Sequence, residues 1–416
     1  MDNILVSVIC TAYNHEKFIK DAIEGVVNQK TNFNYELIVH DDASTDGTAS
    51  VIREYEEKYP QLIKAIYQKE NQYKKRRIYE SILFPIVRGK YIAFCEGDDY
   101  WISRDKLQKQ IDFMESHEEY SMCMHNAIQL NFENGEEKIL NTFPKTGTYS
   151  QEEQIRTGMG TNFPAFASYV IRTKFLQGIP DFFYESRTVD YTIRQYYANC
   201  GKVYYFEEVM SVYRVKTPSS YMKKISDDQQ FYNNYTLKMI RFFEQFDRYT
   251  NEKYHDILEC KIESDYFGFC LSIEKEEGIS KAITGGLNLE IIKECYQRLA
   301  VEHVDNSIRE MNKKVNSLFI YGTSRVAVVC KKQLEYAAIG FDGFVVSDNQ
   351  MKPDIFEGKK VYYLSEVVSR YNHSGFILGV QPINAKRIIE ILREHKIENY
   401  CQPYTRKSRI GRSLGK

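Results

Sequence analysis

The sequence predicts an α/β fold for the first part of the chain, and two observations lead to that prediction. Short apolar segments alternate with segments of helical spacing, so strands and helices follow one another. Polar side chains stand directly after several of the expected strands. Alternating strands and helices favour a parallel sheet with right-handed crossovers. The polar groups should then meet at the carboxyl edge of that sheet, where open α/β sheets bind ligands.

The expected elements follow from apolar periodicity. Four short apolar segments are predicted strands: residues 4–10, 35–40, 63–67 and 91–95. The first connecting helix places six apolar residues on one face: Phe18, Ile19, Ala22, Ile23, Val26 and Val27. The second helix is predicted at residues 47–58 and must end before Pro60, whose ring cannot continue a helix. A third helix is expected between the last two strands.

The most informative segment follows the fourth predicted strand. Glu96, Asp98 and Asp99 place three carboxylates within four residues. Crowded carboxylates raise one another's pKa, so a positive charge should offset them. Hard oxygen ligands suit Mg²⁺ or Mn²⁺, and the segment is interpreted as a cation site. The alternative is a solvated acidic turn.

A second acidic strand end follows the second predicted strand. Ser44, Thr45 or Asp46 can cap the helix that comes next. Capping explains Asp46 well. It explains Asp41 and Asp42 poorly, because they precede the cap at the strand tip, where they could accept hydrogen bonds from a ligand.

These segments and their order resemble glycosyltransferase family 2, whose catalytic domain has the GT-A fold. The matching segments are residues 6–14, 36–48, 89–101 and 106–110, then Asp190–Tyr191 and Val212–Arg214. The resemblance implies a Rossmann-like mixed sheet and an inverting mechanism. It also implies a nucleotide-diphosphate sugar as donor, with a UDP-sugar as the first choice.

The resemblance implies a role for each matching position on the nucleotide side. Thr11 and Tyr13 would line the base pocket, and Asp42 would bond the base or the ribose. Glu96 falls on the first acidic position of the family's DXD motif, where Asp is usual. It would lie near the ribose or the metal.

The resemblance also implies the residues on the diphosphate side. Asp98 would ligate a Mn or Mg ion that bridges the two phosphates, and Asp99 would support it. Arg214 is a candidate to approach the diphosphate. So is Lys216, which stands where the family often has His.

The general base is expected at Asp190. An acceptor hydroxyl is a weak nucleophile and needs a base on the far side of the sugar from the nucleotide. Asp190 precedes a helical pattern, and the family places its catalytic acid residue at the start of a helix here. The alternative is an ordinary N-cap or first-turn carboxylate, which any helix start favours.

Three further features carry weaker signals. Residues 74–77 form a basic run that would meet phosphates or an anionic acceptor, or is only a solvated charge run. His125 ends an apolar strand and is interpreted as a buried structural histidine. Ser168 is a candidate to face the sugar.

Composition excludes several classes of protein. The 416 residues carry a net charge of −1, so bulk electrostatics does not favour nucleic acid. No apolar run approaches the ~20 residues that cross a bilayer. Nine scattered cysteines without CxxC spacing argue against a disulfide framework or a zinc site. A strand at the N-terminus with no signal peptide predicts a cytoplasmic protein, at the inner membrane face if its acceptor is lipid-linked.

Three parts are predicted along the chain: a catalytic domain at 1–225, a helical linker at 226–314 and a small Rossmann-like domain at 315–416. The linker is expected to pack on the catalytic domain or to build an oligomer contact. In the last domain Gly322 opens a strand-to-helix loop and Asp348 could mimic a ribose-binding acid. Only one of the usual glycines is present, so an accessory role in acceptor recognition or oligomerisation is favoured over dinucleotide binding.

Together these features predict a metal-dependent inverting glycosyltransferase acting on a bacterial surface glycan, a glycoconjugate or a lipid-linked precursor. Its expected partners are the nucleotide-sugar donor and that acceptor. Peripheral membrane association and a homo-oligomer stay open. Two alternatives are a non-catalytic nucleotide-binding regulatory module, which the intact Asp98 and Asp190 disfavour, and a two-carboxylate glycosidase, which the nucleotide-like site disfavours.

Overall fold

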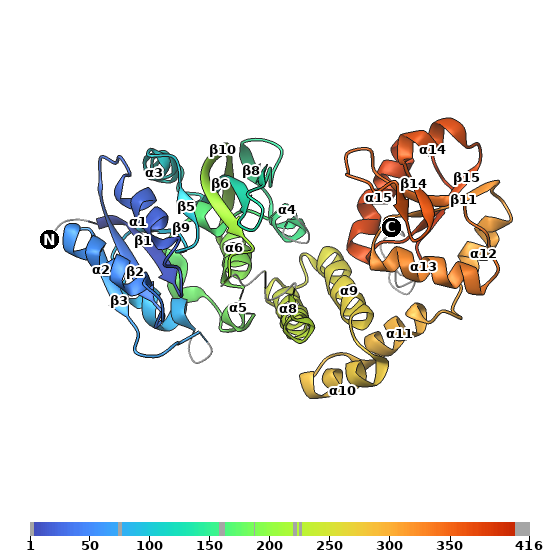
Figure 1. Cartoon of the computed structure of the whole chain (residues 1–416), viewed down its shortest axis with the longest axis horizontal. Coiled ribbons are helices and arrows are strands. Elements are labelled where there is room, and N and C mark those ends of the chain that lie inside the picture. The colour runs from blue at the N-terminus through green and yellow to red at the C-terminus, as the bar shows by residue number, and fades with distance from the viewer. Residues whose placement is uncertain are drawn as a thin grey trace. The chain divides into compact units, whose positions relative to one another are not determined.

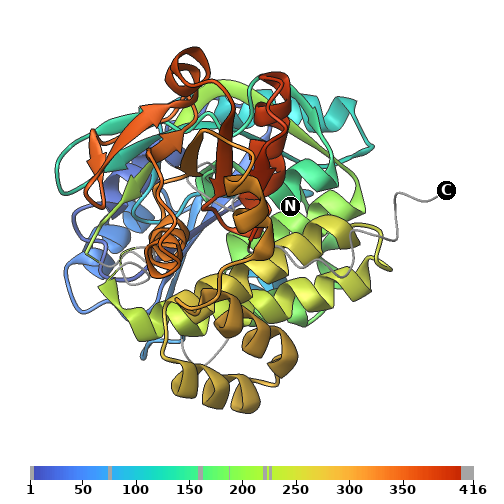
Figure 2. The same ribbon diagram turned by 90° about the vertical axis from the view of Figure 1, so that its right-hand side faces the viewer.

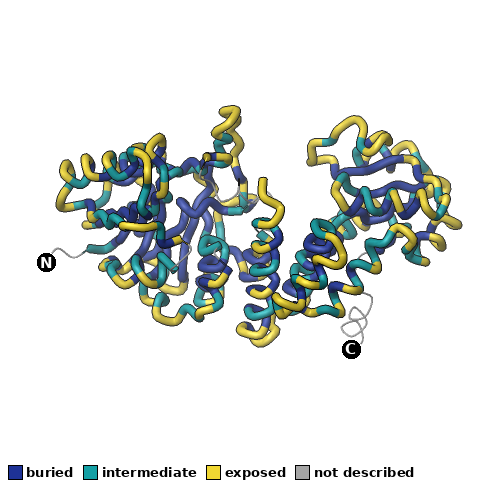
Figure 3. The backbone as a smooth tube through the Cα atoms, turned by 60° about the horizontal axis from the view of Figure 1, so that its bottom comes forward, coloured by how far each residue is buried: buried dark blue, intermediate teal, exposed yellow. Residues whose placement is uncertain are grey.

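The computed structural model describes residues 4–73, 77–157, 163–186, 188–218, 223 and 227–403. The chain divides into two compact units, Met1–Tyr232 and Asn233–Lys416 (Figure 1). Each unit is built on its own sheet. The central strands of both sheets, such as β4 (Tyr91–Phe94) and β12 (Gly343–Val346), are buried, whereas β7 (Glu137–Ile139) at the margin of the first sheet is exposed (Figure 3).

The first unit is built on one mixed sheet. Its strands lie in the order β3-β2-β1-β4-β9-β6-β10-β5, with β7 paired to β6 and β8 paired to β10. Their bounds are β1 Ile4–Ala12, β2 Asn34–Asp41, β3 Ile63–Tyr67, β4 Tyr91–Phe94, β5 Tyr100–Trp101, β6 Tyr120–Asn131, β7 Glu137–Ile139, β8 Gly147–Tyr149, β9 Val170–Arg172 and β10 Lys202–Val215. The mixed sheet implied by the resemblance is confirmed.

The direction of the strands decides where the functional edge lies. β1, β2, β3 and β4 are parallel neighbours, and so are β6 and β10. β9 runs antiparallel to both β4 and β6, so these two strands point the same way. The carboxyl ends of β1, β2, β4 and β10 therefore share one edge of the sheet.

The helices of this unit confirm most of the predicted spacing. They are α1 Ile19–Val27, α2 Thr48–Lys58, α3 Lys106–Ser116, α4 Gln151–Arg156, α5 Phe182–Glu185 and α6 Val189–Cys200. The apolar face predicted for α1 is buried except for Val27, which is partly buried, and α2 ends before Pro60. The N-cap of α2 is Gly47, so none of the three residues considered occupies it. Asp46 stands one residue earlier, and its Oδ1 accepts a hydrogen bond of 3.0 Å from the N–H of Thr48.

The connection between β3 and β4 differs from the predicted α-helix. Its described residues contain a π-helical turn, η1 Tyr79–Leu83, and a 3-10 turn, η2 Phe84–Ile86. Pro85 lies in this segment, offers no backbone N–H and crowds the preceding turn, which explains the irregular geometry. The prediction of a regular helix here is wrong.

The short strand β5 was not predicted, and it fixes the position of the acidic loop. Tyr100 and Trp101 pair antiparallel with Val212 and Ser211 of β10. Residues 95–99 therefore form a loop with a sheet strand at each end. The pairing brings the carboxyl end of β10 next to this loop. Without it the two would be separated, because β9 and β6 lie between β4 and β10 in the sheet.

The second unit combines helices with a smaller sheet of strand order β13-β14-β12-β11-β15-β16. Its helices are α8 Gln229–Tyr249, α9 His255–Leu271, α10 Lys275–Gly285, α11 Leu289–Leu299, α12 Asn306–Asn312, α13 Arg325–Tyr336, α14 Leu364–Arg370 and α15 Pro382–Glu394. Its strands are β11 Ser317–Tyr321, β12 Gly343–Val346, β13 Ile355–Phe356, β14 Lys359–Tyr363, β15 Ser374–Leu378 and β16 Tyr400–Cys401.

The helical segment and the smaller sheet share one hydrophobic core. Figure 2 shows the ribbon of the chain with the helices and strands of this unit toward the viewer. Ile292 of α11 and Ile308 of α12 belong to the same buried cluster as Leu318 and Ile320 of β11. Residue 314, the predicted boundary of the last domain, lies inside this unit. Among the described residues, no helix is long and apolar enough to cross a membrane.

Candidate functional site

The carboxyl edge of the first sheet brings the predicted nucleotide and metal residues together. Backbone bonds join the segments at this edge. The N–H of Asp42 donates to the carbonyl of Ala12 at 2.9 Å, and the N–H of Gly97 donates to the carbonyl of Thr11 at 2.9 Å. The end of β1 therefore lies between the acidic end of β2 and the acidic loop after β4.

Burial and mutual repulsion determine the protonation of the acidic loop. The pKa of Glu96 is raised to about 8, first by burial and then by the charges of Asp98 and Asp190. Burial, followed by the charges of Asp98 and Glu96, raises the pKa of Asp99 well above its usual range. Oδ2 of Asp99 is buried without a hydrogen-bond partner. An excess of negative charge and an orphaned carboxylate oxygen fit a cation with oxygen ligands.

The protein would supply only part of the coordination shell of such a cation. Among the described residues, no three His, Cys, Asp or Glu side chains are grouped so that they could hold a metal ion. Mg²⁺ sites commonly combine one or two carboxylates with substrate phosphates and water. Asp98 and Asp99 are the residues that could supply the one or two carboxylates of such a site.

Asp190 is the second residue of α6 and is not its cap, because Thr188 occupies the N-cap position. Burial raises the pKa of Asp190, while bonds from backbone N–H groups, including that of Tyr191, and the charge of Arg194 oppose the rise. The charge of Asp190 contributes to the raised pKa of Glu96, so the start of α6 lies near the acidic loop. The N-cap alternative is wrong, and a position in the first turn is what the structure shows.

Two tyrosines border the space around these carboxylates. Tyr213 of β10 has its pKa raised well above the usual range by burial, with contributions from Asp99, Asp190, Glu96 and Asp98. Burial, followed by the charge of Glu96 and then that of Asp190, raises the pKa of Tyr79 of η1 well above the usual range. The motif that contains Tyr213 was recognised in the sequence without a role for that residue. Tyr79 was missed, because the segment was expected to be a plain helix.

The predicted base contacts lie at the ends of β1 and β2. Tyr13 is 37% exposed, so its ring is accessible to a ligand. Asp42 is buried, and its two carboxylate oxygens accept hydrogen bonds from the N–H groups of Gln72 (2.7 Å) and Tyr73 (3.1 Å). Asp42 therefore anchors the segment that follows β3. Its contact with a base or ribose stays a prediction.

Arg214 is packed against the acidic loop. Its guanidinium lies 4.4 Å from the ring centroid of Tyr100 and donates to the carboxylate of Asp21 at 2.5 Å. The same group donates to the carbonyl oxygen of Asp98 at 3.0 Å. The backbone N–H of Arg214 donates to Oδ1 of Asp99 at 2.8 Å. Arg214 thus supports the loop, and its contact with a diphosphate stays a prediction.

The weaker sequence signals have different outcomes. His125 is fully buried, as predicted, and burial holds its pKa well below the usual range. Ser168 is also fully buried and donates its hydroxyl hydrogen to the carbonyl of Ala165 at 2.6 Å. The interpretation that Ser168 faces the sugar is wrong. Residues 74–76 of the basic run lie outside the described residues.

Two residues without a predicted role approach Asp98. The hydroxyl of Thr217 donates to Oδ2 of Asp98 at 3.1 Å, and Nε2 of His15 lies 4.0 Å from the same oxygen. Neither apolar periodicity nor carboxylate clustering marks these positions in the sequence. The only available signal was their location directly after segments that carry the family resemblance.

The Gly322 loop of the second unit is closed by its own contacts. Gly322 has a φ of +108°, and a Cβ there would lie 3.0 Å from the carbonyl oxygen of Gly379. The hydroxyl of Ser324 donates to that same carbonyl at 3.0 Å. Asp348 accepts hydrogen bonds from the N–H and hydroxyl of Ser365. These contacts add no support to dinucleotide binding, which the sequence already disfavours.

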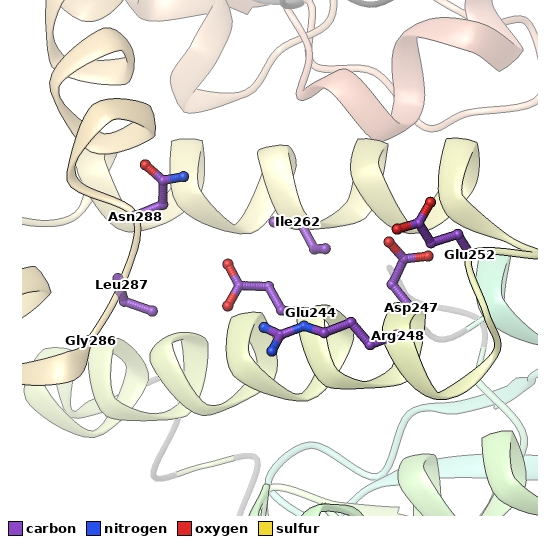
Figure 4. Close-up of a pocket in the computed structure, with 8 residues that line it drawn as sticks. All are labelled: Glu244, Asp247, Arg248, Glu252, Ile262, Gly286, Leu287 and Asn288. Atoms are coloured by element: carbon purple, nitrogen blue, oxygen red, sulfur yellow. The ribbon is translucent and has the colours of Figure 1, made fainter.

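A separate cavity of about 570 Å³ lies in the second unit (Figure 4). It is lined by residues of α8, α9 and the segments beside them: Glu244, Asp247, Arg248, Glu252, Ile262, Gly286, Leu287 and Asn288. The hydroxyl of Tyr266 donates to Glu244 at 2.9 Å and accepts from the N–H of Asn288 at 3.1 Å, which ties its walls together. None of the predicted site residues lines this cavity.

The fold and the site define a class of protein. The carboxyl edge of this mixed sheet carries an acidic loop and an accessible aromatic ring, and ligands of open α/β sheets bind at such an edge. Residues 7–173 match the family described as Glycosyl transferase family 2. The match lies within the first unit of the chain, and for this part the resemblance found in the sequence is confirmed.

Relatives and solved structures agree with this match. An uncharacterized protein of Mycobacterium tuberculosis is 30% identical over 227 residues, which cover 55% of this chain and 63% of that protein. The Escherichia coli UDP-Glc:alpha-D-GlcNAc-diphosphoundecaprenol beta-1,3-glucosyltransferase WfaP is 34% identical over 128 residues, 31% of this chain and 48% of that protein. The chain thus spans less than two thirds of either relative.

Among solved structures, S. aureus TarS 1–349 in complex with UDP-GlcNAc is similar, with a TM-score of 0.51 and 17% identity. The match covers 80% of this chain and 89% of that one. At this identity the likeness concerns the fold alone, and it agrees with the GT-A architecture.

Proposed function

We propose that the protein is a metal-dependent inverting glycosyltransferase. It would move a sugar from a nucleotide diphosphate, UDP first, to a hydroxyl of a bacterial surface glycan, a glycoconjugate or a lipid-linked precursor. The observation that carries this proposal is that the acidic loop is bonded to the ends of both β1 and β10 at one edge of the sheet. Asp190, in the first turn of a separate helix, contributes its charge to this loop. The name of WfaP, a UDP-Glc-dependent transferase with a lipid-linked acceptor, supports the choice of donor and acceptor.

In the proposed reaction Asp190 accepts the proton of the acceptor hydroxyl. The hydroxyl oxygen then attacks the anomeric carbon while the bond from that carbon to the diphosphate breaks. A single displacement of this kind inverts the configuration. Because burial raises the pKa of Asp190, its carboxylate is a stronger base than an exposed aspartate. Tyr79 and Tyr213 would flank the sugar and keep water from it.

Asp98 and Asp99 are the residues proposed to hold Mn or Mg. A bound ion of this type supplies Lewis-acid stabilisation of the departing diphosphate. Glu96 would lie beside the ribose or the ion, and Tyr13 would stack on the base. A lipid-linked acceptor would place the protein at the inner face of the cell membrane, and any other acceptor would leave it in the cytoplasm.

The first test is thermal stabilisation of the full chain by UDP, GDP, CDP and NAD, each with and without Mn²⁺. A ligand at ~100 times its dissociation constant adds about 2.7 kcal/mol to the stability of the domain that binds it. That gain corresponds to a shift of several degrees. Stabilisation by UDP only with Mn²⁺ would support the proposal, and the absence of a shift with every nucleotide would contradict it.

A second measurement separates an enzyme from a regulatory module. UDP-sugars should be consumed slowly by the wild-type protein even with water as the acceptor, releasing UDP. Binding without any release of UDP from a panel of UDP-sugars, with or without oligosaccharide acceptors, would favour the regulatory module.

A further inference from the structure

We infer that Thr217 is a positioning residue for Asp98, holding one carboxylate oxygen so that the other is presented to the metal. The inference rests on the proposed metal-dependent transfer, but it concerns a contact within the chain itself. Thr217 lies outside the acidic motif and follows the last strand of the first sheet. Its role would be to orient the Asp98 carboxylate toward the metal without contacting the metal itself.

The contacts of the Asp98 carboxylate are one-sided. The Thr217 hydroxyl donates to Oδ2 at 3.1 Å, and Nε2 of His15 stands 4.0 Å from that same oxygen. Thr217 is fully buried, whereas the side chain of Asp98 keeps 18% of its surface exposed. With Oδ2 held from the protein side, Oδ1 is the oxygen left for a ligand.

The backbone after β10 places the Thr217 hydroxyl. β10 ends at Val215, and Lys216 adopts a φ of +61°, in the left-handed region that a lysine rarely occupies. The chain bends at Lys216, and the next residue, Thr217, hydrogen-bonds to Asp98. Such a conformation persists only where surrounding contacts maintain it, and it recurs at functional sites.

His15 forms the second wall. Its backbone N–H donates to the hydroxyl oxygen of Thr48 at 2.8 Å, which fixes the start of the segment after β1. A Cβ at Gly97 would lie 2.8 Å from Nδ1 of His15, so the ring sits directly against the backbone of the acidic loop. The carboxylate of Asp98 is therefore confined between His15 and Thr217.

This arrangement matches the general behaviour of residues behind metal ligands. Partners that hydrogen-bond to a ligating carboxylate set its orientation, and their loss typically weakens metal affinity by roughly 10–100-fold. Thr217 should therefore affect the affinity for the metal and leave the metal-free affinity for nucleotide unchanged. A purely structural threonine would instead change stability without changing metal affinity.

The test measures the dissociation constant of Mn²⁺ in the presence of saturating UDP, by titration of the free Mn²⁺ signal in electron paramagnetic resonance. Thr217→Val removes the donor at nearly constant volume, and we expect an affinity for Mn²⁺ about tenfold weaker. Thr217→Ser keeps the hydroxyl and should stay close to wild type. Thr173→Val is the matched control, because the Thr173 hydroxyl also donates to a buried partner, the carbonyl of Gly89 at 2.7 Å.

A second pair of variants tests the turn without touching Thr217. Lys216→Gly and Lys216→Val both remove the lysine side chain and its ion pair with Glu133. Glycine adopts the left-handed region at no steric cost, whereas a β-branched residue does not. Because both variants lose the same side chain, only the turn distinguishes them, and Lys216→Val should bind Mn²⁺ more weakly than Lys216→Gly. This comparison holds even if Thr217→Val proves poorly folded.

The outcomes separate this inference from the proposed function. Wild-type Mn²⁺ affinity in folded Thr217→Val, together with equal affinities in the two Lys216 variants, would overturn the positioning role and leave the proposed transferase intact. A wild-type protein that binds UDP but no Mn²⁺ would overturn the metal dependence itself, and the inference with it.

Discussion

The backbone N–H of Arg214 donates a hydrogen bond of 2.8 Å to Oδ1 of Asp99, across 115 residues of sequence. The bond forms because β5, which directly follows the acidic loop, pairs with β10. The end of β10 and the acidic loop are therefore one structural element. Asp190 lies on α6, in a different part of the chain, and its charge acts on the acidic loop. The acidic loop and Asp190 can therefore be tested by separate substitutions.

Asp98→Asn should abolish the Mn²⁺-dependent stabilisation by UDP. The amide keeps the size of the carboxylate but loses the charge that attracts a divalent cation. The measurement is the melting temperature with UDP, with and without Mn²⁺. Asp105→Asn, at an exposed carboxylate before α3, is the control and should respond like wild type. A full Mn²⁺-dependent shift in Asp98→Asn would remove Asp98 as the metal ligand.

Asp190→Asn should keep donor binding and lose transfer. Loss of a general base typically lowers the rate by about 10²–10⁴-fold, while binding of UDP with Mn²⁺ depends on other residues. UDP release from a UDP-sugar measures the rate of transfer, and thermal stabilisation by UDP with Mn²⁺ measures donor binding. The control is Asp181→Asn, on a side chain that is 82% exposed. Turnover at the wild-type rate in Asp190→Asn would exclude it as the base.

Lys106 should make the stability of the first unit depend on pH. Burial lowers the pKa of Lys106 from 10.5 to about 7. Between these values the unfolded chain binds a proton that the folded chain does not, so stability rises with pH. The melting temperature of wild type relative to Lys106→Met should therefore rise from pH 7 to pH 9.

The neighbouring Lys109 provides the matched control for that measurement. Lys109 lies three residues after Lys106 in the same helix. Its side chain is 44% exposed and forms an ion pair with Glu208. Lys109→Met should track wild type across the pH range. Parallel pH profiles for wild type and Lys106→Met would show that Lys106 does not lose its charge in the folded protein.

Truncation should respect the two units. A chain that ends at Asp228, before α8, should melt cooperatively, because the first sheet has its own core. A chain that ends at Lys314 should expose Ile292 and Ile308, which pack with β11 in the intact protein. Limited proteolysis of this longer fragment should remove the helical segment quickly. Resistance equal to that of the full chain would contradict the shared core.

The sequence was sufficient for features that are local along the chain. β1 to β4 and the polar residues at their ends follow from short apolar runs and from motif spacing, and the structure brings these ends together. The irregular connection before β4 could have been anticipated, since Pro85 stands in the segment assigned to a helix.

The missed features depend on contacts between distant segments. The pairing of β5 with β10, the bond from Thr217 to Asp98 and the anchoring of Gln72 and Tyr73 by Asp42 all join residues far apart in sequence. No periodicity records such contacts. Hence the acidic residues could be selected from the sequence, whereas the groups that hold them in place could not.

Anchoring of the acidic loop by β4 and β5 also affects the entropy of ligand binding. Ordering a flexible backbone costs roughly 1–2 kcal/mol per residue, and residues 95–99 avoid much of that cost because both ends are already held in the sheet. Their amide hydrogens should exchange slowly even without nucleotide or metal. The affinity for the donor would then depend mainly on the charges of the carboxylates in this loop. The cost of ordering the loop backbone on binding would matter far less.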